Sequence, residues 1–119
     1  MKILIVDDHK FYVNELLEKL REDGHNVHYA KNYLEAQSII DQNPQFDISL
    51  LDVILQNGRT GLHLAEEYGT KLGRIMFVTG CNDDTTIKAI STKYASASKI
   101  LSIWGPLKEF MNGGKPSII

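Results

Sequence analysis

The sequence predicts an α/β protein in which a parallel sheet is covered by helices on both faces. Short strand-like runs alternate with amphipathic segments five times along the chain. Several of these runs, such as residues 3–6 and 75–78, are apolar at every position, which is typical of strands buried on both sides. Alternating strands and helices favour a parallel sheet, and right-handed crossovers leave few topologies.

The composition fits one domain. The chain has 119 residues, of which 43% are hydrophobic and 24% charged, and this length is sufficient for one core. The net charge is -2 and the basic residues are dispersed, so nothing indicates nucleic-acid binding. The single cysteine, Cys81, excludes an internal disulfide and argues against a zinc site. Because no membrane span or signal peptide is found, we expect a cytoplasmic protein.

The first half of the chain predicts three strands separated by two helices. The first helix has apolar residues at i, i+3, i+4 and i+7, and Gly24 suits the C′ position after its end. Asn32 and Glu35 resemble a capping box at the start of the second helix, and Asn43-Pro44 stops it. The predicted strands are residues 2–6, 26–30 and 46–51.

The second half predicts three more helices and two more strands. Gly61 to Tyr68 is a helix after a polar loop that begins at Gln56, and another helix begins at Asp83-Asp84. Ser96-Ala97-Ser98 is interpreted as a connection, followed by a fifth strand from Lys99 to Trp104. Gly105-Pro106 turns the chain into a short last helix. The fourth strand is predicted at residues 74–78. The whole domain is predicted to span residues 1–112, followed by a flexible tail at residues 113–119.

Groups suited to phosphoryl chemistry follow three of the strands. Asp7 and Asp8 end the first, Asp52 the third and Thr79 the fourth. Ligands of open α/β sheets bind beyond the carboxyl ends of the strands, where three carboxylates would favour a Mg²⁺ ion. Asp52 could then act as an oxygen nucleophile. Alternatively, the acids only begin helices or loops, and Thr79 is only a β-branched strand residue.

Three stretches carry a family resemblance. Residues 3–8, Leu50-Leu51-Asp52 followed nine residues later by Gly61-Leu62, and residues 77–80 resemble the receiver domain of two-component response regulators. The resemblance covers residues 2 to about 111. It implies a flavodoxin-like, or CheY-like, (βα)5 doubly wound parallel sheet in strand order 2-1-3-4-5.

The resemblance also implies roles for the site residues. Asp52 is similar to the family's phosphoacceptor, and Thr79 to its switching hydroxyl. Asp7, Asp8 and Asp52 resemble the Mg²⁺ ligands, with the Ile54 carbonyl as a further one. The implied partners are a histidine kinase or phosphotransfer protein and an unknown protein target. The implied chemistry is self-catalysed phosphoryl transfer and hydrolysis rather than that of a separate enzyme. We expect a monomer or weak homodimer. We expect no contact with nucleic acid or a membrane.

The predicted fifth strand departs from the family, which carries a lysine at its end, before a proline. If Pro106 is that proline, Gly105 occupies the lysine position. Lys99 would lie at the opposite end of the strand, about 16 Å from the phosphorylation edge. We therefore expect the pocket to lack this lysine, although a differently placed strand would bring Lys99 into it. Gln56 replaces the family's usual loop proline, and Ile100 or Ser102 occupies the region of its aromatic switch residue.

Three functions compete on these grounds. The leading one is a phosphorylated receiver, and the second is a degenerate receiver that binds a protein partner independently of phosphorylation. The third, a small Mg²⁺-dependent phosphohydrolase, is disfavoured because no aspartate stands two residues after the first acid, as in haloacid-dehalogenase-like enzymes. His9 is the histidine nearest the acids, but its spacing indicates no ligand role, so it is interpreted as a surface or boundary residue.

Overall fold

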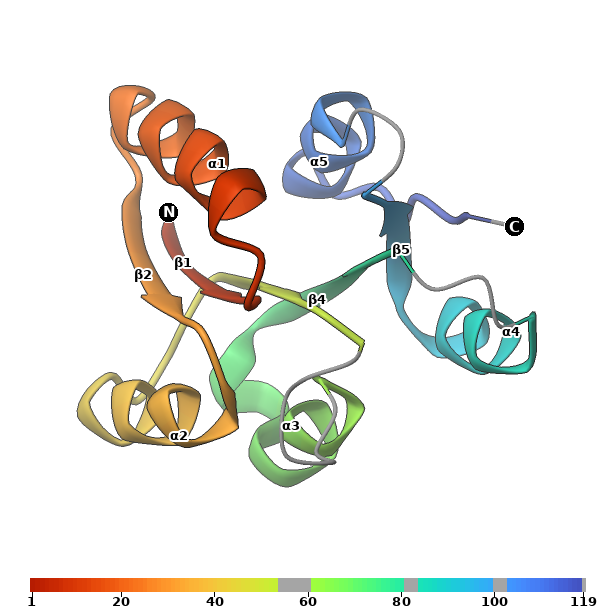
Figure 1. The fold of residues 1–119 in the computed structure, drawn as a ribbon, viewed down its shortest axis with the longest axis horizontal. Helices are drawn as coiled ribbons and strands as arrows, with labels where there is room; N and C mark the ends of the chain where they lie inside the picture. Colours follow the sequence, from red (N-terminus) through yellow and green to blue (C-terminus); the bar gives the residue numbers. More distant parts are fainter. Residues whose placement is uncertain (54–60, 81–83, 100–102, 119) are drawn as a thin grey trace.

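The computed structural model describes residues 1–53, 61–80, 84–99 and 103–118 (Figure 1). Five parallel strands form one sheet in the order β2-β1-β3-β4-β5. This order confirms the predicted fold class. The strands are β1 (Lys2–Val6), β2 (Asn26–Ala30), β3 (Ile48–Leu51), β4 (Arg74–Thr79) and β5 (Ala95–Ser98).

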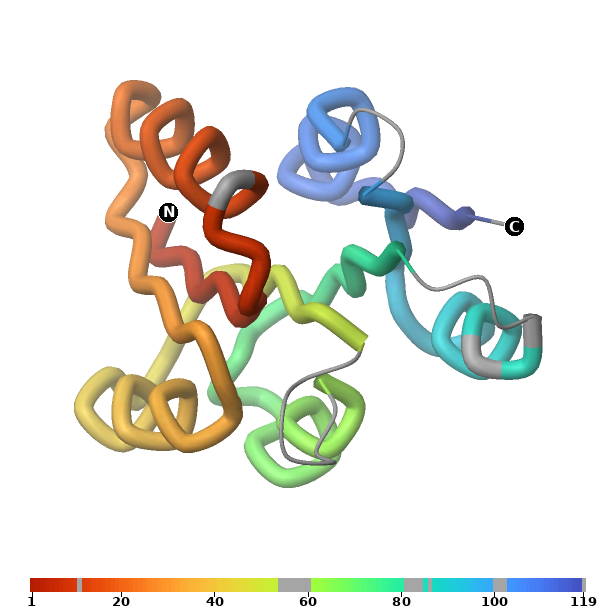
Figure 2. The backbone as a smooth tube through the Cα atoms, viewed as in Figure 1, coloured from red at the N-terminus to blue at the C-terminus, as the bar shows by residue number. Residues whose placement is uncertain are grey.

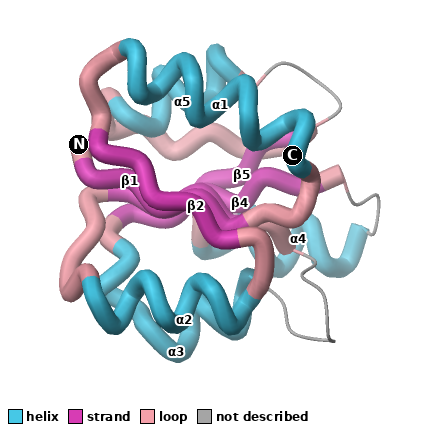
Figure 3. The backbone as a smooth tube through the Cα atoms, turned by 60° about the vertical axis from the view of Figure 1, so that its left-hand side comes forward, coloured by secondary structure: helices cyan, strands magenta, loops and turns pink. Residues whose placement is uncertain are grey.

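Helices cover both faces of the sheet, as Figure 3 shows from the side. Residues of α1 and α5 form one core with one face, and residues of α2, α3 and α4 form a second core with the other. The helices are α1 (Lys10–Glu22), α2 (Tyr33–Gln42), α3 (Gly61–Tyr68), α4 (Asp84–Lys93) and α5 (Trp104–Met111), with a 3-10 turn η2 (Gly69–Leu72) before β4.

The interior strand β1 shows why its apolar run can be recognised in the sequence. Its side chains alternate between the two cores, with Ile3 and Ile5 in one and Leu4 and Val6 in the other. Each of the four is at most 1% exposed. A strand with cores on both sides has no solvent-facing position, and its sequence is therefore apolar throughout.

Several predicted element ends are confirmed. Gly24 follows the C-cap of α1 and has a φ of 88°, in the left-handed region that glycine adopts without strain. The Asn32 side chain accepts a hydrogen bond of 2.9 Å from the Glu35 backbone amide, so it caps α2. The helix predicted over Gly61 to Tyr68 has those bounds.

The predicted fifth strand is wrong. β5 is Ala95–Ser98, which was interpreted in part as a connection, and Trp104 begins α5 instead of ending a strand. Gly105 and Pro106 lie in the first turn of this helix, where a proline loses no helical hydrogen bond. The error has a physical reason: β5 is buried through alanine and serine, whose side chains give no apolar pattern.

Residues 113–118, which the sequence predicts to be a flexible tail, contact β5 and its neighbours. The Ser96 backbone amide donates to the Pro116 carbonyl at 2.9 Å, and the Ile118 amide donates to Ser96 Oγ at 3.0 Å. Arg74 Nη2 donates to the Gly114 carbonyl at 2.8 Å. The segment therefore runs along the side of β5 that is not paired with β4, near the C label in Figures 1 and 2.

Candidate functional site

Two buried carboxylates extend from the middle of the sheet. Asp7 follows β1 and Asp52 follows β3, and they are 2% and 4% exposed. Backbone bonds continue the ladder past the strand ends, from the Asp7 amide to Ala30 O (3.1 Å) and from the Asp52 amide to Val6 O (2.9 Å). The sheet thus brings together two acids that are far apart in the sequence, as predicted from the strand ends.

Lys99 lies between these carboxylates, contrary to the prediction that the pocket lacks a lysine. Its Nζ is 2.8 Å from Oδ2 of Asp7 and 2.8 Å from Oδ2 of Asp52. Because β5 ends at Ser98, Lys99 is the first residue beyond the strand, and its amide donates to the Thr79 carbonyl at 3.0 Å. The expected separation of about 16 Å came from placing Lys99 at the start of the strand rather than after its end.

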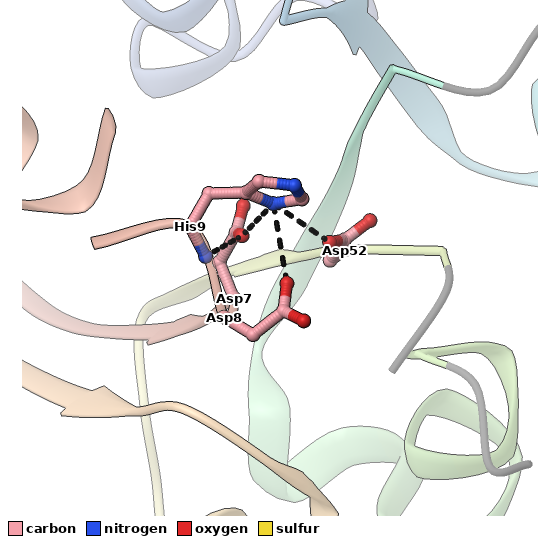
Figure 4. A group of neighbouring side chains, drawn as sticks. All are labelled: Asp7, Asp8, His9 and Asp52. Carbon is pink, nitrogen blue, oxygen red and sulfur yellow. Dashed lines mark hydrogen bonds and ion pairs between the residues drawn. The ribbon is translucent and has the colours of Figure 1, made fainter. Parts of the chain in front are cut away.

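His9 also reaches into the cluster, although the sequence indicated no role for it (Figure 4). Its Nδ1 is 2.9 Å from Asp7 Oδ1, 3.2 Å from Asp8 Oδ1 and 3.7 Å from Asp52 Oδ2. Its backbone amide donates to Asp7 Oδ1 at 2.9 Å, which fixes the turn between β1 and α1. The histidine spacing along the chain could not predict this contact, because the turn creates it.

Two tyrosines support the pocket, and the sequence singled out neither. Tyr29 donates its hydroxyl hydrogen to the Asp7 carbonyl at 2.7 Å. Tyr12 packs beside Lys99, whose Nζ is 5.6 Å from the ring centroid. Burial raises the pKa of the Tyr12 hydroxyl well above its usual range, and the charges of Asp7 and Asp52 raise this pKa further. Tyr12 therefore stays neutral beside the acids.

Gly61 allows α3 to approach the Asp52 backbone. A Cβ at this position would lie 2.1 Å from the Asp52 carbonyl oxygen, closer than any side chain tolerates. The Gly61 amide donates to the Val53 carbonyl at 3.1 Å, which ties the start of α3 to the chain after β3. The sequence placed Gly61 correctly in a helix start but gave no reason for glycine there.

Thr79 ends β4 on the same edge of the sheet and is 3% exposed. It pairs in register with Ser98, the residue before Lys99. Other predicted positions lie outside the described residues: the Ile54 carbonyl, Gln56, Cys81, Asp83, Ile100 and Ser102.

The acids fit a divalent cation. One ligand atom from each of Asp7, Asp8, His9 and Asp52 lies within 4.8 Å of all the others. Asp8 Oδ1 is shielded from solvent and, apart from the 3.2 Å contact with His9 Nδ1, has no hydrogen-bond partner among the described residues. An ionised carboxylate oxygen in this position needs positive charge, and oxygen-rich sites of this kind suit Mg²⁺ or Ca²⁺.

Comparison with known families identifies the chain. The family model of the response regulator receiver domain matches residues 3–102 of the sequence. The chain belongs to this family. Domains of this family act as phosphoacceptors in two-component signalling.

Solved receiver structures share the fold. A two-component response regulator from Clostridium difficile is 27% identical, with a TM-score of 0.80 over 95% of this chain and 97% of that one. A receiver domain protein from Methanospirillum hungatei JF-1 is 23% identical, with a TM-score of 0.78 over 93% and 90% of the two chains. A Burkholderia pseudomallei response regulator, described with a phosphorylated aspartic acid and a calcium ion, is 24% identical, with a TM-score of 0.74. That match covers 89% of this receiver but only 64% of the longer protein.

None of the helices in the described part of the receiver combines the length and apolar character that crossing a bilayer requires.

Proposed function

We propose that this receiver accepts a phosphoryl group on Asp52 from a phosphohistidine of a histidine kinase or phosphotransfer protein, with Mg²⁺, and signals through a protein partner. The observation that carries the proposal is the position of Lys99, whose Nζ is 2.8 Å from carboxylate oxygens of both Asp7 and Asp52. A fixed ammonium beside a carboxylate nucleophile is suited to stabilising charge on an incoming phosphoryl group.

In the proposed reaction, an Asp52 oxygen attacks the phosphorus atom. The O–P bond forms as the P–N bond of the donor phosphohistidine breaks, and the imidazole leaves with a proton. Lys99 holds positive charge near the new phosphoryl oxygens, and the Thr79 hydroxyl donates a hydrogen bond to one of them. Mg²⁺ held by Asp7, Asp8 and Asp52 would supply further positive charge.

A small phosphodonor tests this proposal. Purified protein is incubated with Mg²⁺ and acetyl phosphate, and its intact mass is measured. We expect one phosphoryl group on the wild type and on Asp41→Asn, which removes an exposed acid of α2, but none on Asp52→Asn. Phosphorylation retained in Asp52→Asn, or absent from the wild type, would contradict the assignment of Asp52.

Lys99 also bears on the alternative of a phosphorylation-independent binding module. That alternative rests on a pocket without a lysine and on an altered fifth strand, and the Lys99 contact with Asp52 argues against the first of these grounds. Amide NMR shifts on phosphorylation distinguish the two functions. Shifts that spread from Asp52 to Lys99 and along β5 are expected of a receiver that changes its partner affinity, whereas shifts confined to the residues around Asp52 favour the module.

A further inference from the structure

His9 faces groups that make contradictory demands on its Nδ1 atom. Lys99 Nζ is 2.9 Å from this nitrogen, and an ammonium can only donate, so the contact requires a lone pair on Nδ1. The oxygen atoms of Asp7 and Asp8, at 2.9 and 3.2 Å, can only accept when ionised, so they require a hydrogen on Nδ1. One nitrogen cannot satisfy both.

A cation among these atoms would remove the conflict. The lone pair of Nδ1 and the carboxylate lone pairs would then be directed at the cation. The Lys99 ammonium would give up its contact with Nδ1 and keep the separate contact with the other oxygen of Asp7, Oδ2. Asp8 Oδ1 is buried and, among the described residues, contacts only Nδ1, so the cation would give this oxygen a positively charged neighbour as well.

The distances from Nδ1 to Asp7 and Asp8 match shared coordination, and the distance to Asp52 is longer. Neighbouring ligands of an octahedral ion with bonds of about 2.1 Å are about 3.0 Å apart. Nδ1 lies 2.9 Å from the Asp7 oxygen, 3.2 Å from the Asp8 oxygen and 3.7 Å from the Asp52 oxygen. Figure 4 shows that all three carboxylates contact this one nitrogen.

We propose that His9 is a ligand of the bound cation through Nδ1, and that it makes this site prefer Mn²⁺ and other first-row transition ions over Mg²⁺. Mg²⁺ favours oxygen ligands, whereas imidazole binds transition metals well, so adding one nitrogen to three carboxylates shifts selectivity toward the latter. This inference rests on the cation site of the proposed function and is independent of phosphoryl transfer.

The direct test uses Mn²⁺ as the probe. Pulsed electron paramagnetic resonance detects a nitrogen-14 nucleus bound to Mn²⁺ in the full chain. We expect the coupling in the wild type and its loss in His9→Ala. The matched control is His25→Ala, because His25 precedes β2 at the opposite edge of the sheet and bonds to the N-terminus. This control should keep the coupling. Bound Mn²⁺ without nitrogen coupling in the wild type would overturn the inference.

Affinities test the claimed selectivity. Titration should show His9→Ala weakening Mn²⁺ binding by about tenfold and Mg²⁺ binding by less than about threefold, with His25→Ala unchanged for both. If His9→Ala instead binds Mn²⁺ as tightly as or more tightly than the wild type, the imidazole is not a ligand and competes for the carboxylates.

The outcomes also separate this inference from the proposed function. Nitrogen coupling without any phosphorylation of Asp52 supports the metal assignment and contradicts the phosphoacceptor. Phosphorylation of Asp52 with Mg²⁺, together with bound Mn²⁺ that shows no nitrogen coupling, supports the phosphoacceptor and contradicts the His9 assignment. Absence of Mn²⁺ and Mg²⁺ binding in the wild type overturns the His9 assignment together with the cation site.

Discussion

β1 and β5 are each followed by a charged residue of the pocket, Asp7 and Lys99, but the two strands differ in their packing. β1 pairs with strands on both sides and carries large aliphatic residues such as Leu4, which is fully buried. β5 pairs with β4 alone, is built from alanine and serine, and has residues 114–118 along its other side. The carboxylate of Asp7 therefore extends from a rigid centre, whereas Lys99 extends from an edge with little side-chain packing of its own.

The difference teaches that the two charges can be perturbed separately. Changes in the centre should affect the whole domain, because both cores share β1. Changes around β5 should mainly affect the position of Lys99. The following experiments either break or sharpen this contrast, in order of decreasing expected effect.

The largest effect is expected for Leu4→Ala. This change removes a fully buried side chain from the core that β1 forms with α2, α3 and α4, and we expect the free energy of unfolding to fall by about 4 kcal/mol. Urea denaturation measures the loss. The control is Leu34→Ala, whose side chain is 69% exposed and which should change stability by less than about 0.5 kcal/mol. Equal effects at both positions would refute the central role of β1.

Lys99→Ala should rank second. It leaves the buried Asp7 and Asp52 carboxylates without their shared ammonium, and we expect a loss of about 3 kcal/mol, the lower end for breaking a buried ion pair. Because Mg²⁺ can replace the missing charge, saturating Mg²⁺ should reduce this loss. Lys88→Ala, an exposed lysine of α4, is the control. A loss that is insensitive to Mg²⁺ would show that charge pairing is not its cause.

Removal of residues 114–119 should have a smaller effect. The deletion eliminates the bond from the Ser96 amide to Pro116 and the bond from Ile118 to Ser96 Oγ, and we expect a loss of about 2 kcal/mol. Hydrogen exchange at the Ser96 amide should accelerate more than exchange at the Leu4 amide, which should follow only the loss of global stability. Fast Ser96 exchange in the intact chain would instead agree with the flexible tail that the sequence predicts.

The smallest effect concerns His28, on the opposite edge strand β2. Burial, followed by the charges of Lys2 and Arg21, lowers the pKa of His28 below 6.5. The unfolded chain then binds the proton more readily, so stability should fall as the pH drops from about 6.5 through the lower folded pKa. His28→Gln should remove this part of the pH dependence, and His25→Gln should retain it. Identical pH profiles for wild type and His28→Gln would contradict the assignment.

The sequence alone determined the sheet centre and the acidic pocket. β1 and β4 are apolar runs because each lies between two neighbouring strands and two layers of helix, and this leaves a pattern that can be read without structure. Asp7, Asp8 and Asp52 were found because they follow such strands directly. Local capping signals, such as Asn32 with Glu35, were equally readable, since they act within a few residues.

Only the tertiary structure determined the bounds of β5 and the positions of the Lys99 and His9 side chains in the acidic pocket. Ala95, Ser96 and Ala97 are buried because α4, α5 and residues 114–118 pack around their small side chains, so the strand itself shows no apolar period. Once this strand is displaced by a few residues, Lys99 moves from one end of the sheet to the other. His9 reaches three carboxylates because two separate strands end beside it, and such contacts depend on the folded arrangement rather than on neighbours in the chain.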